Sequence, residues 1–187
     1  MWNEVNKDER RCCFVYYAQI KEFDIANGLG VRVSLFVSGC THRCPECFNE
    51  IAWDFHYGKE FTEETIDYLI EAISPDHIAG LSLLGGEPME LSNQEGLLPL
   101  LRKFKEVYPQ KNVWCYTGYL LEDLLEGGKV HGQHTDELLS YIDVLVDGPF
   151  ILDLKNIRLK FRGSKNQRII CLQETLASKN IVLWQEN

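Results

Sequence analysis

Short apolar segments that end at glycine alternate with segments of helical periodicity along most of this 187-residue chain. Strands that alternate with helices are typical of parallel βαβ units, so the pattern predicts an α/β fold. A closed barrel of eight such units needs about 250 residues, which argues against a complete barrel here. The strands are expected at residues 16–24, 31–37, 78–84, 113–116 and 143–147.

Helices are predicted from apolar stripes and from residues that cap helix ends. Thr62 precedes a run of isoleucine and leucine at helical spacing, so a helix is expected to follow it. Ser92 and Glu95 have the spacing of a capping box, which places the start of the next helix there. Pro99 conflicts with that start, because proline disrupts a helix interior. A short helix after residue 118 and another over residues 135–142 are also expected.

The composition indicates one soluble domain. No repeat or linker divides the chain, so residues 16–187 are predicted to form a single domain after an N-terminal extension, residues 1–15. Lys and Arg total 19 against 28 Asp and Glu, and the net charge of −9 argues against a nucleic-acid partner. No apolar run approaches the roughly 20 residues of a membrane span, and the N-terminus does not resemble a secretory signal. A cytoplasmic protein that does not cross a membrane is therefore expected.

Seven cysteines are many for a chain of this length, and clustered thiols in a reducing compartment suggest a metal site. Only Cys40, Cys44 and Cys47 lie close enough in sequence to form a local ligand set. A structural zinc ion normally takes four ligands, and the fourth would have to be His42, His56 or a distant cysteine. Three thiolates on a four-iron cluster instead leave one iron open to a substrate. A cluster is favoured, with a zinc-stabilised binding domain or three free or redox cysteines as the alternatives.

The other four cysteines receive no functional assignment. Cys115 and Cys171 lie in apolar runs and are predicted to be inert core thiols. Cys12 and Cys13 lie in the N-terminal extension without an evident partner. The loop of three cysteines therefore carries the predicted chemistry.

Three further turns follow predicted strands, and the carboxyl ends of parallel strands form the ligand edge of such a sheet. Two adjacent glycines let a ligand approach the backbone closely, and Glu87 could accept a hydrogen bond from an ammonium group. Asp147 is either a polar residue of the site or a side chain that bonds its own turn. We expect these turns to meet the cysteine loop at one site; they are Gly85-Gly86-Glu87-Pro88, Tyr116-Thr117-Gly118 and Asp147-Gly148.

The spacing Cys40-x3-Cys44-x2-Cys47 after one strand, with Gly-Gly-Glu-Pro after the next, resembles the radical S-adenosylmethionine superfamily. The continuation Cys-Phe-Asn-x3-Trp-Asp is similar to the glycyl-radical-enzyme activases within it. Residues 27–39, 116–119 and 161–168 narrow the resemblance to the activases of anaerobic ribonucleoside-triphosphate reductases. The resemblance covers about residues 17–184 and implies a partial, open β/α barrel with parallel strands.

The resemblance also implies roles for individual residues. Cys40, Cys44 and Cys47 would hold a [4Fe–4S] cluster whose open iron binds the amino and carboxylate groups of S-adenosylmethionine, so they are the predicted catalytic and metal-binding residues. Gly85, Gly86 and Glu87 would contact the ammonium group of S-adenosylmethionine. The backbone of Glu46, Cys47 and Phe48 would contact its adenosine. Thr117 and Asp147 would line the rest of the cofactor pocket.

In the implied reaction, one electron from the reduced cluster cleaves the sulfonium to methionine and a 5′-deoxyadenosyl radical. That radical would take a hydrogen atom from a backbone glycine of the reductase and leave a stored glycyl radical there. Cluster potentials span about −700 to +450 mV, and this reaction needs the low end, which implies a flavodoxin- or ferredoxin-type donor. An activase of another glycyl radical enzyme, of the formate-lyase type, is the alternative enzyme.

Overall fold

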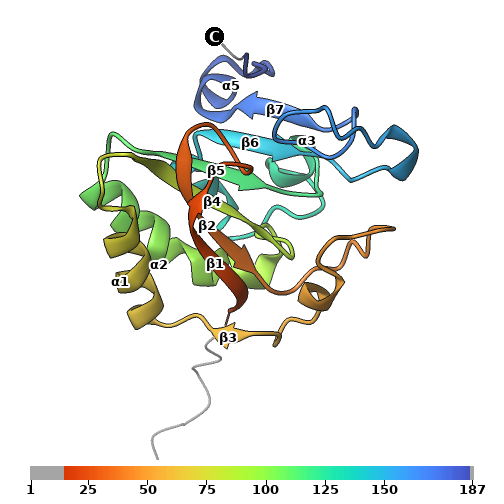
Figure 1. The fold of residues 1–187 in the computed structure, drawn as a ribbon. Helices are drawn as coiled ribbons and strands as arrows, with labels where there is room; N and C mark the ends of the chain where they lie inside the picture. The colour runs from red at the N-terminus through yellow and green to blue at the C-terminus, as the bar shows by residue number, and fades with distance from the viewer. Residues whose placement is uncertain (1–14, 186–187) are drawn as a thin grey trace, which may run out of the picture.

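The computed structural model describes residues 15–185, which form one seven-stranded sheet with helices packed on it (Figure 1). The predicted extension and its two cysteines, Cys12 and Cys13, lie outside the described residues, except for Val15, which is buried. The strands are β1 (Tyr16–Asp24), β2 (Val31–Val37), β3 (Lys59–Glu60), β4 (Ile78–Gly85), β5 (Asn112–Tyr116), β6 (Val144–Asp147) and β7 (Arg168–Cys171). The helices are η1 (Glu50–Trp53), α1 (Glu63–Ile73), α2 (Leu91–Val107), α3 (Leu121–Leu124), α4 (Thr135–Tyr141), η2 (Leu152–Leu154) and α5 (Leu172–Ser178).

The middle of the sheet is parallel, and both of its edges are antiparallel. In the order β3-β1-β2-β4-β5-β6-β7, the pairs formed by β2, β4, β5 and β6 are parallel. β1 and β3 at one edge and β7 at the other run antiparallel to their neighbours. The predicted α/β class is thus confirmed as a mixed sheet, and the open-barrel form stays a prediction. β7 and α5 lie outside the sequence prediction, because the four-residue strand has no alternating pattern.

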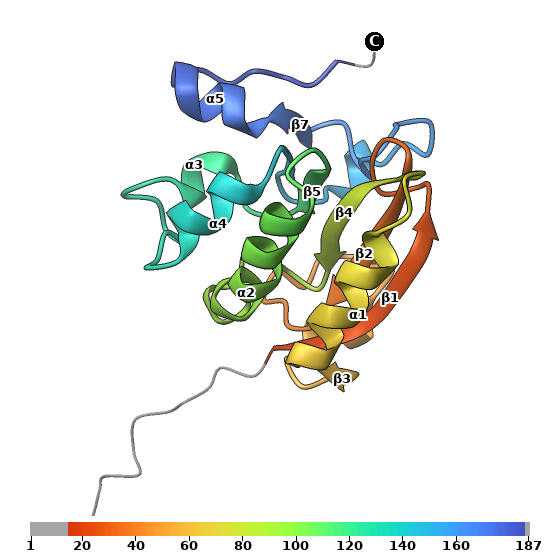
Figure 2. The ribbon, with the colours of Figure 1, turned by 90° about the vertical axis from the view of Figure 1, so that its left-hand side faces the viewer.

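Helices cover one face of the sheet, and the strand period of two decides which side chains reach the core beneath them. α1 packs on β2 and β4, and α2 packs between α1 and α4 (Figure 2). In β5, Val113 and Cys115 are fully buried in this core, whereas Trp114 belongs to a second cluster. Cys115 is therefore a buried core thiol, as its position in an apolar run predicts. Cys171, at the end of β7, is only partly buried.

Helix α1 begins as predicted. Thr62 is its N-cap and shares reciprocal hydrogen bonds with Thr65. Its apolar stripe, Ile66, Leu69 and Ile73, is buried against the sheet. Within residues 15–185, no helix is long and apolar enough to span a membrane.

Helix α2 begins earlier than predicted. Its N-cap is Glu90, so Ser92 and Glu95 lie inside the helix and form no capping box. The first turn binds other parts of the chain instead: the Asn93 amide donates to backbone carbonyls that follow β2 and β4, at 3.0 and 2.9 Å. Pro99 neither starts nor ends the helix, which continues because its apolar face stays buried.

Arg32, on β2, is fully buried although it carries a charge. Its guanidinium donates to Ser82 Oγ at 2.7 Å, to Asn112 Oδ1 at 2.8 Å, and to the carbonyls of Leu81 and Asn112 at 2.8 and 2.9 Å. Burial lowers the pKa of Arg32 to about 10, which leaves the group charged at neutral pH. Ser82 Oγ in turn donates to the Asn27 carbonyl at 2.6 Å. One side chain therefore ties β2, β4 and β5 to the turn between β1 and β2.

Arg32→Leu is expected to lower the free energy of unfolding by roughly 3–5 kcal/mol, because it leaves several buried acceptors without a donor. Equilibrium unfolding in urea measures the change. Arg102→Leu is the matched control, since Arg102 forms an exposed ion pair with Glu137 at 2.6 Å and such exposed pairs contribute little to stability. Equal losses in the two variants would show that Arg32 does not hold the strands together.

Candidate active site

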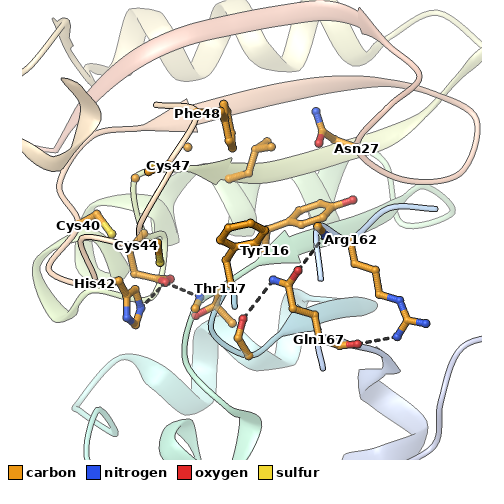
Figure 3. A pocket seen from close by; sticks show the side chains of 18 of the residues that line it. Asn27, Cys40, His42, Cys44, Cys47, Phe48, Tyr116, Thr117, Arg162 and Gln167 are labelled. Carbon is orange, nitrogen blue, oxygen red and sulfur yellow. Dashed lines mark hydrogen bonds and ion pairs between the residues drawn. The ribbon is translucent and has the colours of Figure 1, made fainter. Parts of the chain in front are cut away.

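A cavity of about 480 Å³ lies at the carboxyl ends of β4 and β5 (Figure 3). Its volume falls within the range of about 300–1,000 Å³ that is usual for small-molecule sites. Its walls are the cysteine loop, the turns that follow β4, β5 and β6, the turn between β1 and β2, and the segment between β6 and β7. The structure thus brings together segments that are far apart in sequence, at the edge of the sheet that the topology predicts.

The cysteine loop, residues 40–47, is attached at two sides. The backbone N–H of Cys40 donates to the carbonyl of Trp53 at 3.3 Å. Thr41 donates through its backbone N–H and its hydroxyl to the same oxygen of Glu90, at 2.8 and 2.6 Å. Because Glu90 is the N-cap of α2, the loop is bound to the start of that helix as well as to η1.

The three thiols of this loop suit a multinuclear cluster better than a single metal ion. Cys40, Cys44 and Cys47 are each partly buried, form no disulfide and line the same cavity. A zinc ion needs its sulfur ligands to converge on one point at about 2.3 Å. Among residues 15–185, no three Cys, His, Asp or Glu side chains are grouped so that they could hold a metal ion. In an iron–sulfur cubane each thiolate binds a different iron, so three thiols that one loop brings to the same cavity fit that group.

Neither histidine that could complete a zinc site is placed to do so. His42 Nε2 lies 2.9 Å from the carboxylate of Glu87 and is engaged there. The side chain of His56 is 79% exposed and lies beside Asp54. The structure therefore does not favour the zinc alternative.

Burial disfavours the thiolate form of Cys40 and Cys44. It raises the pKa of the Cys40 thiol to about 12 and shifts the pKa of Cys44 in the same direction. Metal ligands must be thiolates, so binding of a cluster here displaces protons from these sulfurs.

Glu87 is almost completely buried, and its carboxylate is occupied by the protein itself. Oε2 accepts hydrogen bonds from the Gly118 N–H at 2.7 Å and from His42 Nε2 at 2.9 Å, and Oε1 accepts one from the Met89 N–H at 2.9 Å. The hydrogen bond to Glu87 raises the pKa of His42. About three of the four acceptor positions of a carboxylate are therefore used. Glu87 lines the cavity, but its carboxylate mainly joins the cysteine loop to the turn after β5.

Gly85 and Gly86 leave one wall of the cavity without side chains. Gly85 has a φ of 111°, a conformation that other residues rarely adopt. A Cβ on Gly86 would lie 2.6 Å from the carbonyl oxygen of Gly39 and 2.9 Å from that of Ala52. The protein's own backbone therefore requires glycine at both positions, and the missing side chains leave backbone atoms open to a ligand.

Gly86→Ala is expected to lower the free energy of unfolding by roughly 1–3 kcal/mol, because its methyl group displaces the backbone that carries Cys40. The iron bound after anoxic reconstitution is expected to fall with it. Gly132→Ala is the control, since a Cβ there would be close only to the flexible end of Leu91, at 2.7 Å. Wild-type iron content and urea stability in Gly86→Ala would contradict the close packing at this turn.

The remaining predicted contact residues, apart from Asp147, also lie on the cavity wall. Glu46 has a φ of 54°, and its carboxylate pairs with Lys155 Nζ at 3.1 Å. Phe48 is 81% exposed and lies at the opposite side of the cavity from Thr117 (Figure 3). Thr117 is nearly buried, and its hydroxyl accepts a hydrogen bond from the Tyr119 N–H at 3.1 Å. Cys47 and Phe48 therefore lie across the cavity from Thr117, whereas His42 holds the start of the loop close to the turn after β5.

Asp147 is the predicted site residue that the structure places elsewhere. It is fully buried, and its carboxylate accepts hydrogen bonds from Arg168 Nε at 2.9 Å and from the Leu121 N–H at 2.8 Å. Asp147 and Glu122 together raise the pKa of Arg168. Gly148 borders the cavity, whereas Asp147 does not. The structure thus pairs Asp147 within the protein, because the unpredicted strand β7 places Arg168 directly opposite it, and the cofactor contact stays a prediction.

Asp147→Asn is expected to lower the free energy of unfolding by roughly 3 kcal/mol, since Arg168 then faces a neutral amide at a buried position. The affinity of the anoxic, cluster-loaded protein for S-adenosylmethionine, measured by equilibrium dialysis, is expected to stay at the wild-type value. Asp136→Asn removes an exposed carboxylate that lies 3.0 Å from His131 and should change neither quantity. Weaker binding of S-adenosylmethionine with unchanged stability would show that Asp147 contacts the cofactor.

Other residues of the cavity were not predicted individually. Asn27 comes from the turn between β1 and β2, and Arg162 and Gln167 come from the segment between β6 and β7. Gln167 Oε1 accepts a hydrogen bond from the Gly163 N–H at 2.9 Å, and its Nε2 donates to the Gly148 carbonyl at 3.1 Å. Residues 161–168 carry part of the family resemblance, which is the signal that points to them. Their local sequence does not show that this segment folds back over the strand ends.

The fold and the cavity define an iron–sulfur protein with a single three-cysteine loop. Comparison with protein families agrees, because residues 26–170, well over half of the chain, match the family described as "4Fe-4S single cluster domain".

Proteins named anaerobic ribonucleoside-triphosphate reductase-activating protein are similar to this chain over most of their length. The protein from Vibrio cholerae is 41% identical over 155 residues, which are 82% of this chain and 96% of the relative. Those from Escherichia coli (strain K12) and Enterobacteria phage T4 are 39% and 38% identical over 153 residues, covering 81% and 82% of this chain and 95% and 92% of the relatives. The chain belongs to this family of activating proteins. The family, the kind of activity and the iron–sulfur cofactor predicted from the sequence are thereby confirmed.

Proposed function

We propose that the protein installs a glycyl radical on an anaerobic ribonucleoside-triphosphate reductase. The observation that carries the proposal is the meeting of three thiols and a glycine pair at one cavity. The names of the relatives favour the reductase over a formate-lyase-type target. When bound, the reduced [4Fe–4S] cluster supplies the electron that cleaves S-adenosylmethionine to methionine and a 5′-deoxyadenosyl radical, which takes a hydrogen atom from the glycine.

In this proposal the cysteine loop binds the cluster, and the turn of Gly85 and Gly86 binds S-adenosylmethionine. Cys40, Cys44 and Cys47 hold the cluster, and their shared cavity wall supports that role. Gly85 and Gly86 present backbone atoms to the methionine ammonium group, because neither has a side chain to block the approach.

Glu87 positions the site instead of binding the ammonium group through its carboxylate. Its hydrogen bonds to His42 and Gly118 hold the cysteine loop against the turn after β5. Glu46, Cys47 and Phe48 are proposed to contact the adenosine from the loop side, and Thr117 from the strand side. Cys47 and Phe48 lie on the other side of the cavity from Thr117 (Figure 3), which supports this arrangement.

Apolar side chains form part of the wall around the space in which the radical would form. Trp53, Phe150, Leu159 and Phe161 all border the cavity. A reactive intermediate in a site that excludes water is protected from side reactions. This lining supports radical chemistry more than hydrolysis.

The fold suits a reaction on a second protein. We propose that the sheet is the open form of a radical S-adenosylmethionine β/α barrel, and the linear strand order, in which β3 and β7 remain edges, supports an open side. A glycine-bearing segment can enter through such a side. A flavodoxin- or ferredoxin-type donor and a cytoplasmic location belong to the same proposal, because the cluster needs a low-potential electron and a reducing environment.

Cys44→Ala is expected to abolish 5′-deoxyadenosine formation and to lower the iron and sulfide content, because the cluster loses one of its three ligands. Cys171→Ala is the control, since Cys171 is partly buried at the far end of β7 and does not line the cavity. Product is measured by chromatography after anoxic reduction with dithionite. Full product formation by Cys44→Ala, or a colourless protein with stoichiometric zinc and no iron, would rule out the cluster.

Electron paramagnetic resonance identifies the target. The reduced protein with S-adenosylmethionine is mixed with the reductase or with a formate-lyase-type enzyme under anoxic conditions. A glycyl radical signal is expected with the reductase. A signal with the lyase alone would establish the alternative activase.

A further inference from the structure

A cationic segment borders the cavity in a chain that is otherwise acidic. Residues 154–168, here called the cationic segment, contain six of the 19 Lys and Arg and none of the 28 Asp and Glu. In the described part of the chain, Arg158 and Lys165 are exposed and have no ion-pair partner. Two positive charges are therefore presented to solvent beside the proposed active site.

Large apolar side chains are exposed next to these charges. Ile157 is 93% exposed, and Phe48, on the cysteine loop side, is 81% exposed. In Figure 1 the segment is the blue loop that extends beyond β6 and β7, on the same side of the molecule as the orange cysteine loop. The ion pair of Lys155 with Glu46 joins the two segments that carry these side chains. Exposed apolar groups that gather on one side of a protein are typical of surfaces that bind another protein.

The cationic segment is also a wall of the cavity. Lys155, Leu159 and Arg162 line it, and Lys155 Nζ lies 3.1 Å from the carboxylate of Glu46 on the cysteine loop. Arg162 Nη1 donates to the carbonyl of Gln167 at 2.5 Å, and this hydrogen bond holds two parts of the segment together. A polypeptide that enters the cavity must therefore touch this segment.

We propose that Phe48 and the cationic segment form the docking surface for the glycine-bearing segment of the reductase. The inference rests on the proposed function, because a hydrogen atom can be taken from a backbone glycine only if that backbone enters the cavity. The exposed residues define the chemistry of the partner: carboxylates pair with Arg158 and Lys165, and an apolar side chain near the glycine packs on Ile157 and Phe48. The occupant is an acidic polypeptide loop with an apolar residue beside its glycine.

The position of the segment favours the reductase over the electron donor. A donor must come near the cluster, but it need not place any of its backbone in the cavity. The cationic segment lines the cavity through Lys155, Leu159 and Arg162, and the exposed Ile157 and Arg158 lie between these lining residues in the chain. Only a partner whose chain enters the cavity contacts both the lining residues and the exposed residues of the cationic segment.

Two variants test the surface without touching the cavity lining. Arg158→Glu/Lys165→Glu reverses the two exposed charges, and Ile157→Asp replaces the exposed apolar group. Lys179→Glu is the matched control, because Lys179 is exposed beyond α5, at the other end of β7. The affinity of the cluster-loaded full chain for the reductase is measured anoxically by fluorescence anisotropy at low and high salt. Dithionite-driven cleavage of S-adenosylmethionine without reductase is measured in parallel.

The double variant is expected to bind the reductase at least about tenfold more weakly at low salt, with a smaller dependence on salt. Ile157→Asp is expected to weaken binding by about tenfold, and Lys179→Glu to leave it unchanged. Cleavage of S-adenosylmethionine should stay at the wild-type rate in all three. Its absence in the wild type would refute the proposed function, independently of the surface.

Two results would overturn the docking surface. The first is wild-type affinity for the reductase in both segment variants. The second is normal glycyl radical formation with dithionite but a loss when reduced flavodoxin supplies the electron, which would assign the segment to the donor.

Discussion

The site depends on one buried carboxylate. Glu87 follows β4, and its hydrogen bonds reach the cysteine loop through His42, the turn after β5 through Gly118, and the start of α2 through Met89. His42 and Gly118 lie 45 and 31 residues from Glu87, whereas Met89 is only two residues away, and no other described side chain joins all three segments. Since a buried carboxylate must be satisfied, its position forces the three segments together. The cavity is the space that this arrangement leaves beside the glycine turn.

A second buried group stabilises the same sheet at its other end. The Arg32 guanidinium donates to acceptors on β4 and β5, and Ser82 extends this network to the turn that carries Asn27. Asn27 lines the cavity, so a network that stabilises the sheet also positions one wall of the site. Packing and function are therefore difficult to separate in this part of the molecule.

Much of the fold could be predicted because its signals are local. The stripe that follows Thr62 and the apolar strands that end at glycine predict α1 and the parallel strands correctly. The prediction of α2 from Ser92 and Glu95 is wrong at its start, because Asn93 binds backbone carbonyls of other segments and the helix begins earlier. The pairing of Asp147 within the protein could not be predicted for a similar reason, since its partner Arg168 lies on a strand too short to show a pattern.

The chemistry could be predicted from residue types alone: the spacing of Cys40, Cys44 and Cys47 limits the kind of metal group, and the glycine pair predicts that a ligand can approach the backbone closely. These properties depend on residue type and on distances of a few residues along one loop. Which polar groups face the cavity, and which are paired within the protein, follows instead from the tertiary structure. Glu87, Asp147 and the cationic segment each take their role from residues far away in sequence. Hydrogen bonds and ion pairs between distant segments form only after the sheet has brought those segments together.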